Sequence, residues 1–379
     1  MKILIVGGAG FIGSRTAQAL SEKGHEVIIV DNFDIQTHGS DRRQSPTAKN
    51  LWKSFQIHEL DAIELGNRPE LWVGVDVLLY LASSTGTGQS MYELQAYAKN
   101  NVAVAAALGE QILNPRNSVS KVVVSGTRAV YGEGAAVCSN HGRVYPSSRP
   151  ADQIRSKNFN CLCPSCKSSL TPVASLESDP PRPVSMYGIT KLSQEQIIQN
   201  ACETRGIPCK VLRYQNVYGP GQSLQNPYTG ILSIFTQLMR QGAEINIFED
   251  GLSTRDFVYI DDVVDCNLNA IGDGGRHYNL LNVGSGTQRT IIQVVECLAR
   301  TLSIPARYNI SGQARIGDIR NAQADIARVQ EAYGINNFIE FEEGVRRFVE
   351  WAMSEPSDDE VKSRYEYSLS KAKERGVLK

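Results

Sequence analysis

Lys2-Ile3-Leu4-Ile5-Val6-Gly7-Gly8-Ala9-Gly10-Phe11-Ile12-Gly13 begins as an apolar run and passes directly into closely spaced glycines. The apolar run predicts a buried parallel strand, and residues 14–23 show the period of a helix. A second apolar run, 26–30, ends in Asp31 and Asn32. A strand, a glycine-rich turn, a helix, a second strand and an acid in this order are typical of a dinucleotide-binding unit.

Each glycine of this spacing has a separate task in such a unit. Gly7 permits the tight turn, Gly10 lets the backbone approach a pyrophosphate, and Gly13 lets the helix pack closely against the strand. The phosphates would lie at the helix N-terminus. The Asp31 carboxylate is placed to bind a ribose 2′-hydroxyl and would repel a 2′-phosphate, which favours NAD over NADP. The alternative is a glycine-rich turn that binds no ligand.

The alternation of strands and helices continues along most of the chain, which predicts a doubly wound parallel α/β sheet. Ligands lie at the carboxyl ends of the strands in such sheets, so Asp61, Leu81 and Ala82 are expected beside the cofactor. Asn101 lies near the start of the following helix and is either a cofactor contact or a structural asparagine. The predicted strands include 55–60, 75–82, 121–125 and 210–213.

The composition is that of an ordinary soluble protein of 379 residues, with 41% hydrophobic and 21% charged residues. A net charge of −1 gives no reason to expect a nucleic acid or an anionic membrane surface as a partner. No apolar run approaches the ~18–20 residues of a membrane span. The opening run is too short for a signal peptide, which with the clustered cysteines predicts the reducing cytoplasm.

Ser185-Met186-Tyr187-Gly188-Ile189-Thr190-Lys191 contains Tyr-x-x-x-Lys at the start of a predicted helix. Residues four apart share one face of a helix, so Tyr187 and Lys191 are expected to be neighbours. A phenol has an unperturbed pKa near ~10, and an adjacent cation lowers it. Tyr187 would then exchange a hydroxyl proton while a hydride moves. For an isolated match, the alternative is a solvated helix face.

Residues 133–182 are rich in Cys, Pro and Ser and interrupt the α/β alternation, which predicts an insertion over 135–182. Cys138-x-x-His141 and Cys163-x-x-Cys166 are two close pairs separated by a loop, a spacing typical of a structural zinc ribbon. Cys161 is an extra thiol, and in an alternative ligand set it would replace one of these four residues. The alternative to a zinc site is a reduced loop without metal. The remaining cysteines are predicted to be small buried hydrophobes, namely Cys202, Cys209, Cys266 and Cys297.

With Gly7-x-x-Gly10-x-x-Gly13, Thr127 and Tyr187-x-x-x-Lys191 together, the chain resembles the extended short-chain dehydrogenase/reductase family. Within it, the chain resembles the branch of NAD-dependent nucleotide-sugar epimerases and dehydratases. The resemblance implies catalysis by Thr127, Tyr187 and Lys191, and a homodimer. It implies a Rossmann-type NAD-binding domain over 1–215 that carries the insertion, a mainly substrate-binding α/β domain over 216–350, and a charged C-terminal tail or peripheral helix over 354–379.

The same resemblance implies the ligand contacts. Segments 213–220, 255–262 and 315–318 match family motifs that hold the substrate diphosphate, and a guanidinium meets phosphate oxygens in a bidentate way. A surface ion pair is the alternative for either arginine alone. The implied substrate contacts are Gly88, Gln89, Ser90, Arg128, Asn216, Arg255 and Arg315. The implied cofactor contacts are Gly7, Gly10, Phe11, Ile12, Gly13, Asp31, Asn32, Asp61, Leu81, Ala82, Asn101 and Lys191.

The residues after Thr127 bear on the reaction. Dehydratases of this family resemble one another in an Asp-Glu pair at this place, whereas the chain has Arg128-Ala129. Residues 127–134 resemble a string of dTDP-L-rhamnose 4-epimerase-like proteins, with Thr for Ser, and that group carries a Cys/His-bearing insertion. We therefore expect an NAD-dependent nucleotide-sugar 4-epimerase with a structural zinc. The alternatives are another nucleotide-sugar oxidoreductase, dehydratase or decarboxylase, a non-catalytic NAD sensor, and a zinc-ribbon nucleic-acid binder.

Overall fold

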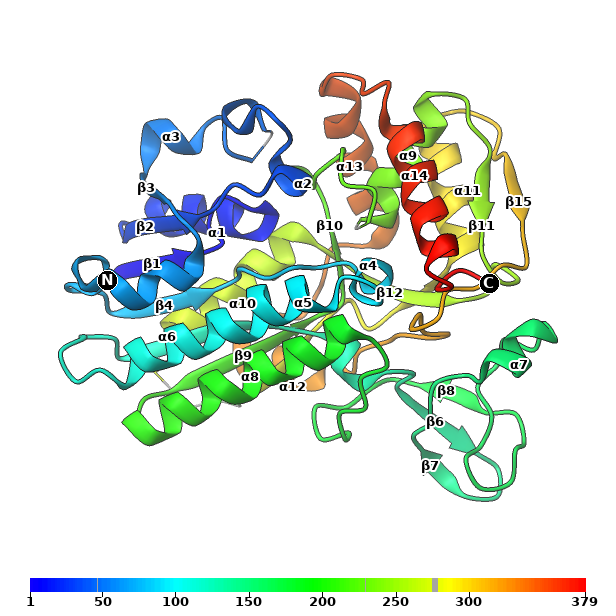
Figure 1. The fold of residues 1–379 in the computed structure, drawn as a ribbon, viewed down its shortest axis with the longest axis horizontal. Helices are drawn as coiled ribbons and strands as arrows, with labels where there is room; N and C mark the ends of the chain where they lie inside the picture. Colours follow the sequence, from blue (N-terminus) through cyan, green and yellow to red (C-terminus); the bar gives the residue numbers. More distant parts are fainter. Residues whose placement is uncertain (46, 229, 275–278) are drawn as a thin grey trace.

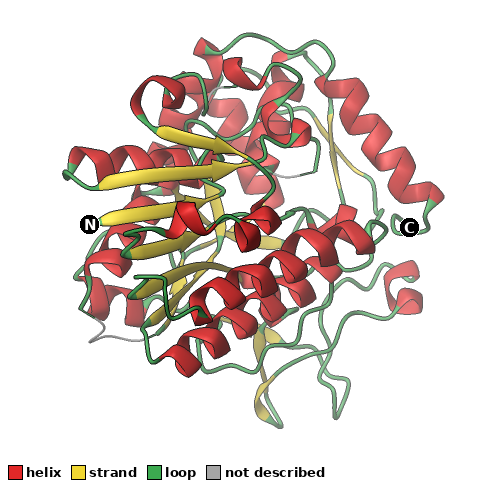
Figure 2. Ribbon diagram, turned by 60° about the vertical axis from the view of Figure 1, so that its left-hand side comes forward, coloured by secondary structure: helices red, strands yellow, loops and turns green. Residues whose placement is uncertain are grey.

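The computed structural model describes residues 1–45, 47–228, 230–274 and 279–379. Its centre is a seven-stranded parallel sheet of order β13-β9-β5-β4-β1-β2-β3, with helices on both faces (Figures 1 and 2). This confirms the predicted doubly wound α/β sheet. The strands are β1 (Lys2–Val6), β2 (Glu26–Asp31), β3 (Gln56–Glu59), β4 (Val77–Tyr80), β5 (Lys121–Thr127), β9 (Cys209–Tyr214) and β13 (Leu280–Val283).

Successive side chains of each strand point to opposite faces of the sheet, and both faces are buried. In β1, Ile3 and Ile5 belong to a core with the helices α1 (Phe11–Glu22), α10 (Ile260–Gly272) and α12 (Ala327–Tyr333). Leu4 and Val6 belong to a core on the other face, with α6 (Val104–Leu113) and α8 (Met186–Arg205). The cysteines predicted as buried hydrophobes are buried, which confirms that prediction.

A smaller lobe lies beside the carboxyl ends of the sheet strands (Figure 1). Its core is built around large apolar side chains such as Phe235, Val294 and Phe348. Two small sheets belong to this lobe, β10-β12-β14 and β11-β15. Its elements are β10 (Asn216–Tyr218), α9 (Ile231–Arg240), β11 (Ile245–Ile247), β12 (Thr254–Tyr259), β14 (Gln288–Thr290), α11 (Ile291–Thr301), β15 (Tyr308–Ile310) and α13 (Phe341–Ser354).

The two lobes do not divide at a single point after residue 215. After β12 the chain returns to the large sheet, where α10 packs on α1 and β13 pairs in parallel with β9. Leu281 and Val283 of β13 are fully buried, because they belong to the same core as α10 and α12. The elements α10, β13 and α12 therefore belong to the lobe with the large sheet, although they come after residue 215, where the sequence placed the domain boundary.

The segment 354–379 is not a solvated tail. It contains α14 (Val361–Glu374), the peripheral helix of the alternative prediction, which packs on α9. The buried residues Val361, Tyr365, Ser368 and Ala372 recur at helical spacing and form one inward face, while the charged residues of the helix lie outside that face. The charged composition therefore describes only the outer face of this helix.

The insertion forms a separate small sheet that projects away from the large one (Figure 1). Its antiparallel strands have the order β7-β6-β8. Its elements are β6 (Ala135–Cys138), β7 (Gly142–Val144), α7 (Ala151–Arg155) and β8 (Thr171–Val173). Short helices elsewhere are α2 (Ile35–His38), α3 (Leu51–Ser54), α4 (Thr87–Ser90) and α5 (Leu94–Tyr97).

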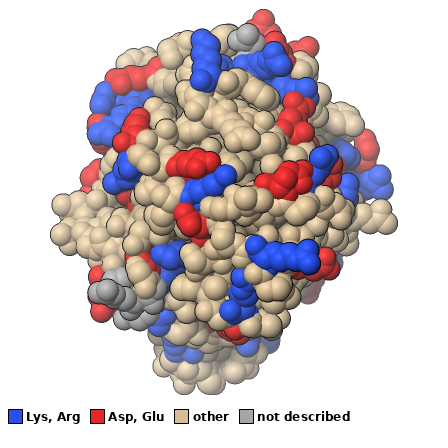
Figure 3. All heavy atoms as spheres, turned by 90° about the vertical axis from the view of Figure 1, so that its left-hand side faces the viewer, with Lys and Arg blue, Asp and Glu red and all other residues tan. Residues whose placement is uncertain are grey.

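The surface is that of a protein with nearly balanced charge. On the face drawn in Figure 3, lysines and arginines are interspersed with aspartates and glutamates. Among the described residues, none of the helices is long and apolar enough to pass through a membrane.

Candidate active site

A cavity of about 740 Å³ opens between the carboxyl ends of the sheet strands and the smaller lobe. Its lining brings together the glycine-rich turn, the predicted catalytic residues and the predicted substrate arginines. Ligand pockets commonly measure ~300–1,000 Å³. The cavity is therefore large enough for a sizeable ligand that reaches from one predicted site to the next.

The glycine turn between β1 and α1 has the form of a phosphate cradle. A Cβ on Gly7, whose φ is +85°, would lie 2.6 Å from the Ala82 nitrogen, and a Cβ on Gly13 would lie 2.3 Å from the Gly7 oxygen. Packing therefore requires glycine at both positions. A Cβ on Gly10 would meet only the Gly7 oxygen, at an ordinary 3.5 Å, and Gly10 lines the cavity at the N-terminus of α1. The space beside Gly10 fits a bound pyrophosphate.

The Asp31 carboxylate at the end of β2 is fixed by backbone donors. The amides of Ala9 and Phe33 each donate to one of its oxygens at 2.9 Å. Asp31 still lines the cavity, as a ribose-binding acid would. The other predicted cofactor residues that line the cavity are Gly7, Gly10, Phe11, Ile12, Gly13, Asn32, Asp61, Leu81, Ala82 and Lys191.

Asn101 is the exception among the predicted cofactor contacts. It is fully buried and does not line the cavity, whereas its neighbour Asn100 does. The Asn101 amide donates to Thr190 at 3.0 Å, and its oxygen accepts from the Ser84 amide at 2.7 Å. These bonds tie the loop after β4 to α8, so the structural alternative describes Asn101.

The predicted catalytic residues meet because α8 begins close to the place where β5 ends. Thr127 is the last residue of β5 and hydrogen-bonds the Tyr187 hydroxyl. Tyr187 is in the first turn of α8, which Ser185 caps by accepting from the Gly188 amide at 3.2 Å. A Cβ on Gly188 would lie 2.6 Å from the Ala129 oxygen. Gly188 therefore permits the close approach that sets Thr127 against Tyr187.

Burial shifts the two titratable groups of this trio in opposite directions. It raises the pKa of Tyr187, against the lowering effects of the Thr127 hydrogen bond and the Arg128 charge. It lowers the pKa of Lys191 to about 7, against the opposite effect of Glu195. The Lys191 ammonium donates to the Ser125 hydroxyl at 3.2 Å. Arg128 is thus a cation that lowers the pKa of Tyr187, and the same effect of Lys191, expected from helical spacing, stays a prediction.

The substrate half of the cavity carries the predicted arginines. Arg128 donates through Nε to the Asn216 oxygen at 2.9 Å, and Arg255 pairs with Asp318 at 2.8 Å. The Arg315 guanidinium lies 4.7 Å from the centre of the Phe248 ring. Three guanidinium groups of one cavity wall can meet a diphosphate.

The predicted substrate contacts near α4 are not all in the cavity lining. Gly88 and Gln89 line it, but Ser90 does not. Ser90 is fully buried and its hydroxyl donates to the Thr87 oxygen at 2.7 Å, so it stabilises α4 rather than facing a ligand. The helix turns Ser90 inward, and this direction depends on the packing of the loop.

Several lining residues carry no motif and were not predicted. Tyr97 is buried, and its ring meets Tyr187 edge-on at 6.4 Å. Phe248 lies in the loop after β11, and Tyr365 lies in α14. Both line the same cavity. The apolar spacing of α14 was the available signal for Tyr365. Nothing local marks Tyr97 or Phe248, because each is an ordinary aromatic residue in a helix or after a strand.

The four predicted metal ligands form a cluster in the insertion, outside the cavity. Cys138, His141, Cys163 and Cys166 have ligand atoms that all lie within 4.8 Å of one another. The Cys138 sulfur lies 3.5 Å from His141 Nδ1 and 3.6 Å from the Cys166 sulfur. Tetrahedral zinc with Zn–S bonds near ~2.3 Å places its ligands at similar separations. Cys161 is buried outside the cluster and does not replace a ligand.

Comparisons with known proteins agree with this geometry. The chain is 33% identical to dTDP-L-rhamnose 4-epimerase from Burkholderia thailandensis, over 93% of this chain and 95% of that protein. UDP-glucuronic acid 4-epimerase from Bacillus cereus, solved with UDP-glucuronic acid and NAD, has a TM-score of 0.75 and 26% identity over 93% of this chain and 99% of its own. UDP-glucose 4-epimerase from Thermotoga maritima, solved with UDP-glucose, has a TM-score of 0.73 and 29% identity over 93% of this chain and 99% of its own.

A family model also matches the chain over residues 3–150 and 161–284. The gap between the two matches falls inside the insertion. The matches include the glycine turn, Thr127, Tyr187, Lys191 and Arg255. On this match and on the arrangement of those residues around one cavity, the chain belongs to the NAD dependent epimerase/dehydratase family.

Proposed function

We propose that this protein is an NAD-dependent nucleotide-sugar 4-epimerase, with dTDP-L-rhamnose as the first candidate substrate. One observation carries the proposal. Thr127, Tyr187 and Lys191 line the same cavity as a dinucleotide cradle and three arginines. The 33% identical relative from Burkholderia thailandensis, named for the same reaction, supports the substrate.

In this mechanism, Tyr187 takes the proton of the sugar 4-hydroxyl, and Thr127 shares the hydrogen bond. NAD, held by the glycine turn and Asp31, would accept the hydride of carbon 4 and return it. The sugar passes through a 4-keto form. Arg128, Arg255 and Arg315 hold the diphosphate while the keto sugar rotates. The hydride can then reach the opposite face of carbon 4. Tyr187 then returns the proton.

The carboxylates of the substrate half argue for epimerisation over elimination of water, which needs a further acid and base. Glu93 pairs with Lys371 at 2.8 Å, and Asp318 pairs with Arg255. Glu249 pairs with Arg149 at 2.7 Å. Each of these lining acids is therefore held by a cation. Arg128-Ala129 also stand where dehydratases that resemble this chain carry an acid pair.

We also propose that the cluster of Cys138, His141, Cys163 and Cys166 binds one structural zinc ion. Three sulfurs and one imidazole are a donor set that zinc prefers. Four protein ligands leave no open position for a substrate, and the cluster lies outside the cavity. The ion would hold together the ends of two turns of the insertion.

The test is an NMR time course of the purified protein with dTDP-L-rhamnose and catalytic NAD, and with UDP-glucose, UDP-glucuronate and UDP-N-acetylglucosamine in parallel. We expect a 4-epimer at equilibrium with no net NADH. A 4-keto product, released carbon dioxide or stoichiometric NADH would assign the protein to another reaction on the same cofactor.

A Tyr187→Phe variant tests the proposed base directly. The phenyl ring keeps the packing against Tyr97 but cannot exchange a proton. We expect unchanged folding and NAD binding and a fall in kcat of at least about 100-fold. Wild-type turnover in this variant would remove Tyr187 from the mechanism.

A further inference from the structure

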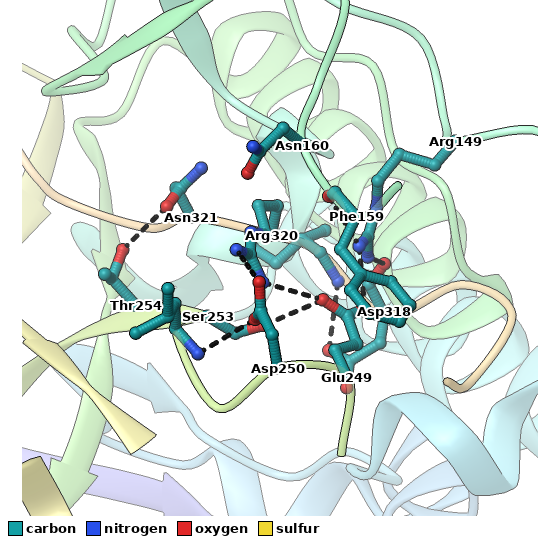
Figure 4. A network of polar contacts seen from close by, with 12 residues as sticks. Arg149, Phe159, Asn160, Glu249, Asp250, Ser253, Thr254, Asp318, Arg320 and Asn321 are labelled. Atoms are coloured by element: carbon teal, nitrogen blue, oxygen red, sulfur yellow. Dashed lines mark hydrogen bonds and ion pairs between the residues drawn. The ribbon is translucent and has the colours of Figure 1, made fainter. Parts of the chain in front are cut away.

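Arg149 of the insertion is buried at the contact between the insertion and the two lobes (Figure 4). It lies between β7 and α7, and only 2% of its side chain is exposed. Its guanidinium reaches four acceptors. It donates to Glu133 at 2.9 Å, Glu249 at 2.7 Å, the Phe159 oxygen at 3.1 Å and the Asp318 oxygen at 3.0 Å. Glu133 lies in the turn after β5, and Glu249 lies in the loop after β11. Phe159 belongs to the insertion, and Asp318 lies in the loop before α12.

The bond to Asp318 leads directly to the substrate half of the cavity. Arg149 holds the backbone oxygen of Asp318, and the Asp318 carboxylate accepts from Arg255 at 2.8 Å. Both Arg255 and Asp318 line the cavity. The position of the Arg255 guanidinium therefore depends on the loop that Arg149 fixes.

A second arginine holds the same loop. Arg320 donates to Glu249 at 3.1 Å and to Asp250 at 2.6 Å, and its amide donates to Glu133 at 2.7 Å. Glu133 and Glu249 thus each bridge the two arginines. Burial by itself would lower the pKa of Arg149, but these two carboxylates outweigh it and raise that pKa. Arg149 is therefore charged, and four of its five N–H donors are already bonded within the protein.

We infer that Arg149 is a positioning residue through which the insertion sets the diphosphate-binding geometry of Arg255. The inference rests on the proposed function, because it assigns the diphosphate of a nucleotide sugar to Arg255. It gives the insertion a role in substrate binding although its metal cluster lies outside the cavity. Arg149 does not touch the substrate.

The experiment compares Arg149→Met with Arg143→Met in the otherwise complete protein. Arg143 belongs to the same insertion, and it pairs with Asp179, also of the insertion, at 2.5 Å. It therefore controls for loss of an arginine and its ion pair within the insertion. Calorimetric titrations with dTDP, UDP and NAD measure the ligand affinity of the two halves of the cavity separately. Steady-state kinetics separate an effect on KM from an effect on kcat.

For Arg149→Met we expect about tenfold weaker binding of the nucleoside diphosphate and a similar rise in KM, since small misplacements of a binding group have effects of this size. NAD affinity and kcat should stay within about threefold. Arg143→Met should bind all three ligands like the wild type. Arg149→Lys keeps the positive charge beside Glu133 and Glu249 but loses the forked donors of the guanidinium. Relative to Arg149→Met, it should therefore recover thermal stability but not diphosphate affinity.

Equal dTDP and UDP affinity in wild type and Arg149→Met would overturn the inference alone. Loss of NAD affinity together with diphosphate affinity would also overturn it, because Arg149 would then only support the fold. A wild-type protein that binds neither dTDP nor UDP would overturn the proposed function and this inference with it.

Discussion

Among single residues, Gly10 and Gly13 belong to the same motif, but each is glycine for a different physical reason. Gly13 has no room for a side chain, because a Cβ would lie 2.3 Å from the Gly7 oxygen. Gly10 has a φ of −68°, which any residue adopts, and its Cβ position is open on the protein side. Gly13 is required by the fold, whereas nothing on the protein side requires glycine at position 10, as expected if the backbone there approaches a ligand.

This difference predicts opposite outcomes for two small substitutions. Gly10→Ala should fold with near wild-type stability and bind NAD at least about tenfold more weakly. Gly13→Ala should lose about 2 kcal/mol or more of the free energy of unfolding, because the backbone must move. Urea denaturation and NAD titration of both variants measure this. Normal NAD affinity in Gly10→Ala would contradict a pyrophosphate beside Gly10.

Lys191, a proposed catalytic group, costs stability. Burial lowers its pKa from 10.5 to about 7, so the unfolded chain binds the proton more tightly than the folded one. The cost is absent above pH 10.5, grows as the pH falls and is complete below about pH 7. Lys191→Met removes the titrating group and loses one hydrogen bond to Ser125.

We therefore expect Lys191→Met to be more stable than the wild type at neutral pH, by about 1–3 kcal/mol after that loss. The difference should shrink as the pH is raised toward ~10, and turnover should fall at least about 100-fold. Urea denaturation of cofactor-stripped protein at two pH values measures it. A variant less stable than the wild type at pH 7 would show that Lys191 is charged without cost.

At the scale of elements, the C-terminal residues brace the segment that carries Arg315. Lys379 and Ala314 exchange backbone hydrogen bonds of 2.9 and 3.0 Å, and the Ile316 amide donates to the Val377 oxygen at 2.8 Å. Arg315 itself forms an antiparallel bridge with Leu378. The bridge fixes the backbone on both sides of a predicted diphosphate contact.

Removal of residues 377–379 should therefore weaken nucleoside diphosphate binding by about tenfold and leave NAD affinity unchanged. Lys379→Ala is the matched control, because it deletes an exposed side chain but keeps the backbone bonds. Titration with dTDP and NAD separates the two effects. If truncation and control bind dTDP equally well, Arg315 does not depend on this brace.

At the scale of the whole molecule, the insertion is a third body attached to the two lobes that form the cavity. Its Cys/His cluster joins the turn after β6 to the turn at 163–166. We expect the purified protein to contain about one zinc per chain, as four ligands satisfy one tetrahedral ion. Cys166→Ala should lose the zinc and become sensitive to protease within 135–182, whereas Cys161→Ala should keep it. Elemental analysis and limited proteolysis measure both, and equal zinc content in the two variants would contradict the ligand set.

The homodimer and the cytoplasmic location stay predictions at this scale. The homodimer comes from the family resemblance, and the cytoplasmic location comes from the short opening run and the clustered cysteines. Analytical ultracentrifugation measures the first. The nearly balanced charge on the face in Figure 3 bears on neither.

The parts that depend on neighbours along the chain could be predicted from the sequence. The glycine turn, the alternation of β1 and the expected pairing of Tyr187 with Lys191 follow from local backbone freedom, strand and helix periods and short motifs, whereas Thr127 was named from the family resemblance. Metal-ligand spacing within two short turns is local in the same sense. In these cases the chemical environment is set by residues close in the sequence, so a pattern could be interpreted without coordinates.

The use of each side chain depended on contacts that form only in the folded chain. The tertiary structure turned Asn101 and Ser90 away from the cavity, returned β13 to the large sheet and packed the charged segment 354–379 as a helix. It also joined Arg149 to Asp318, which lies 169 residues further along the chain. Such contacts leave no period or motif, because burial and hydrogen-bond partners come from segments that meet only when the chain is folded.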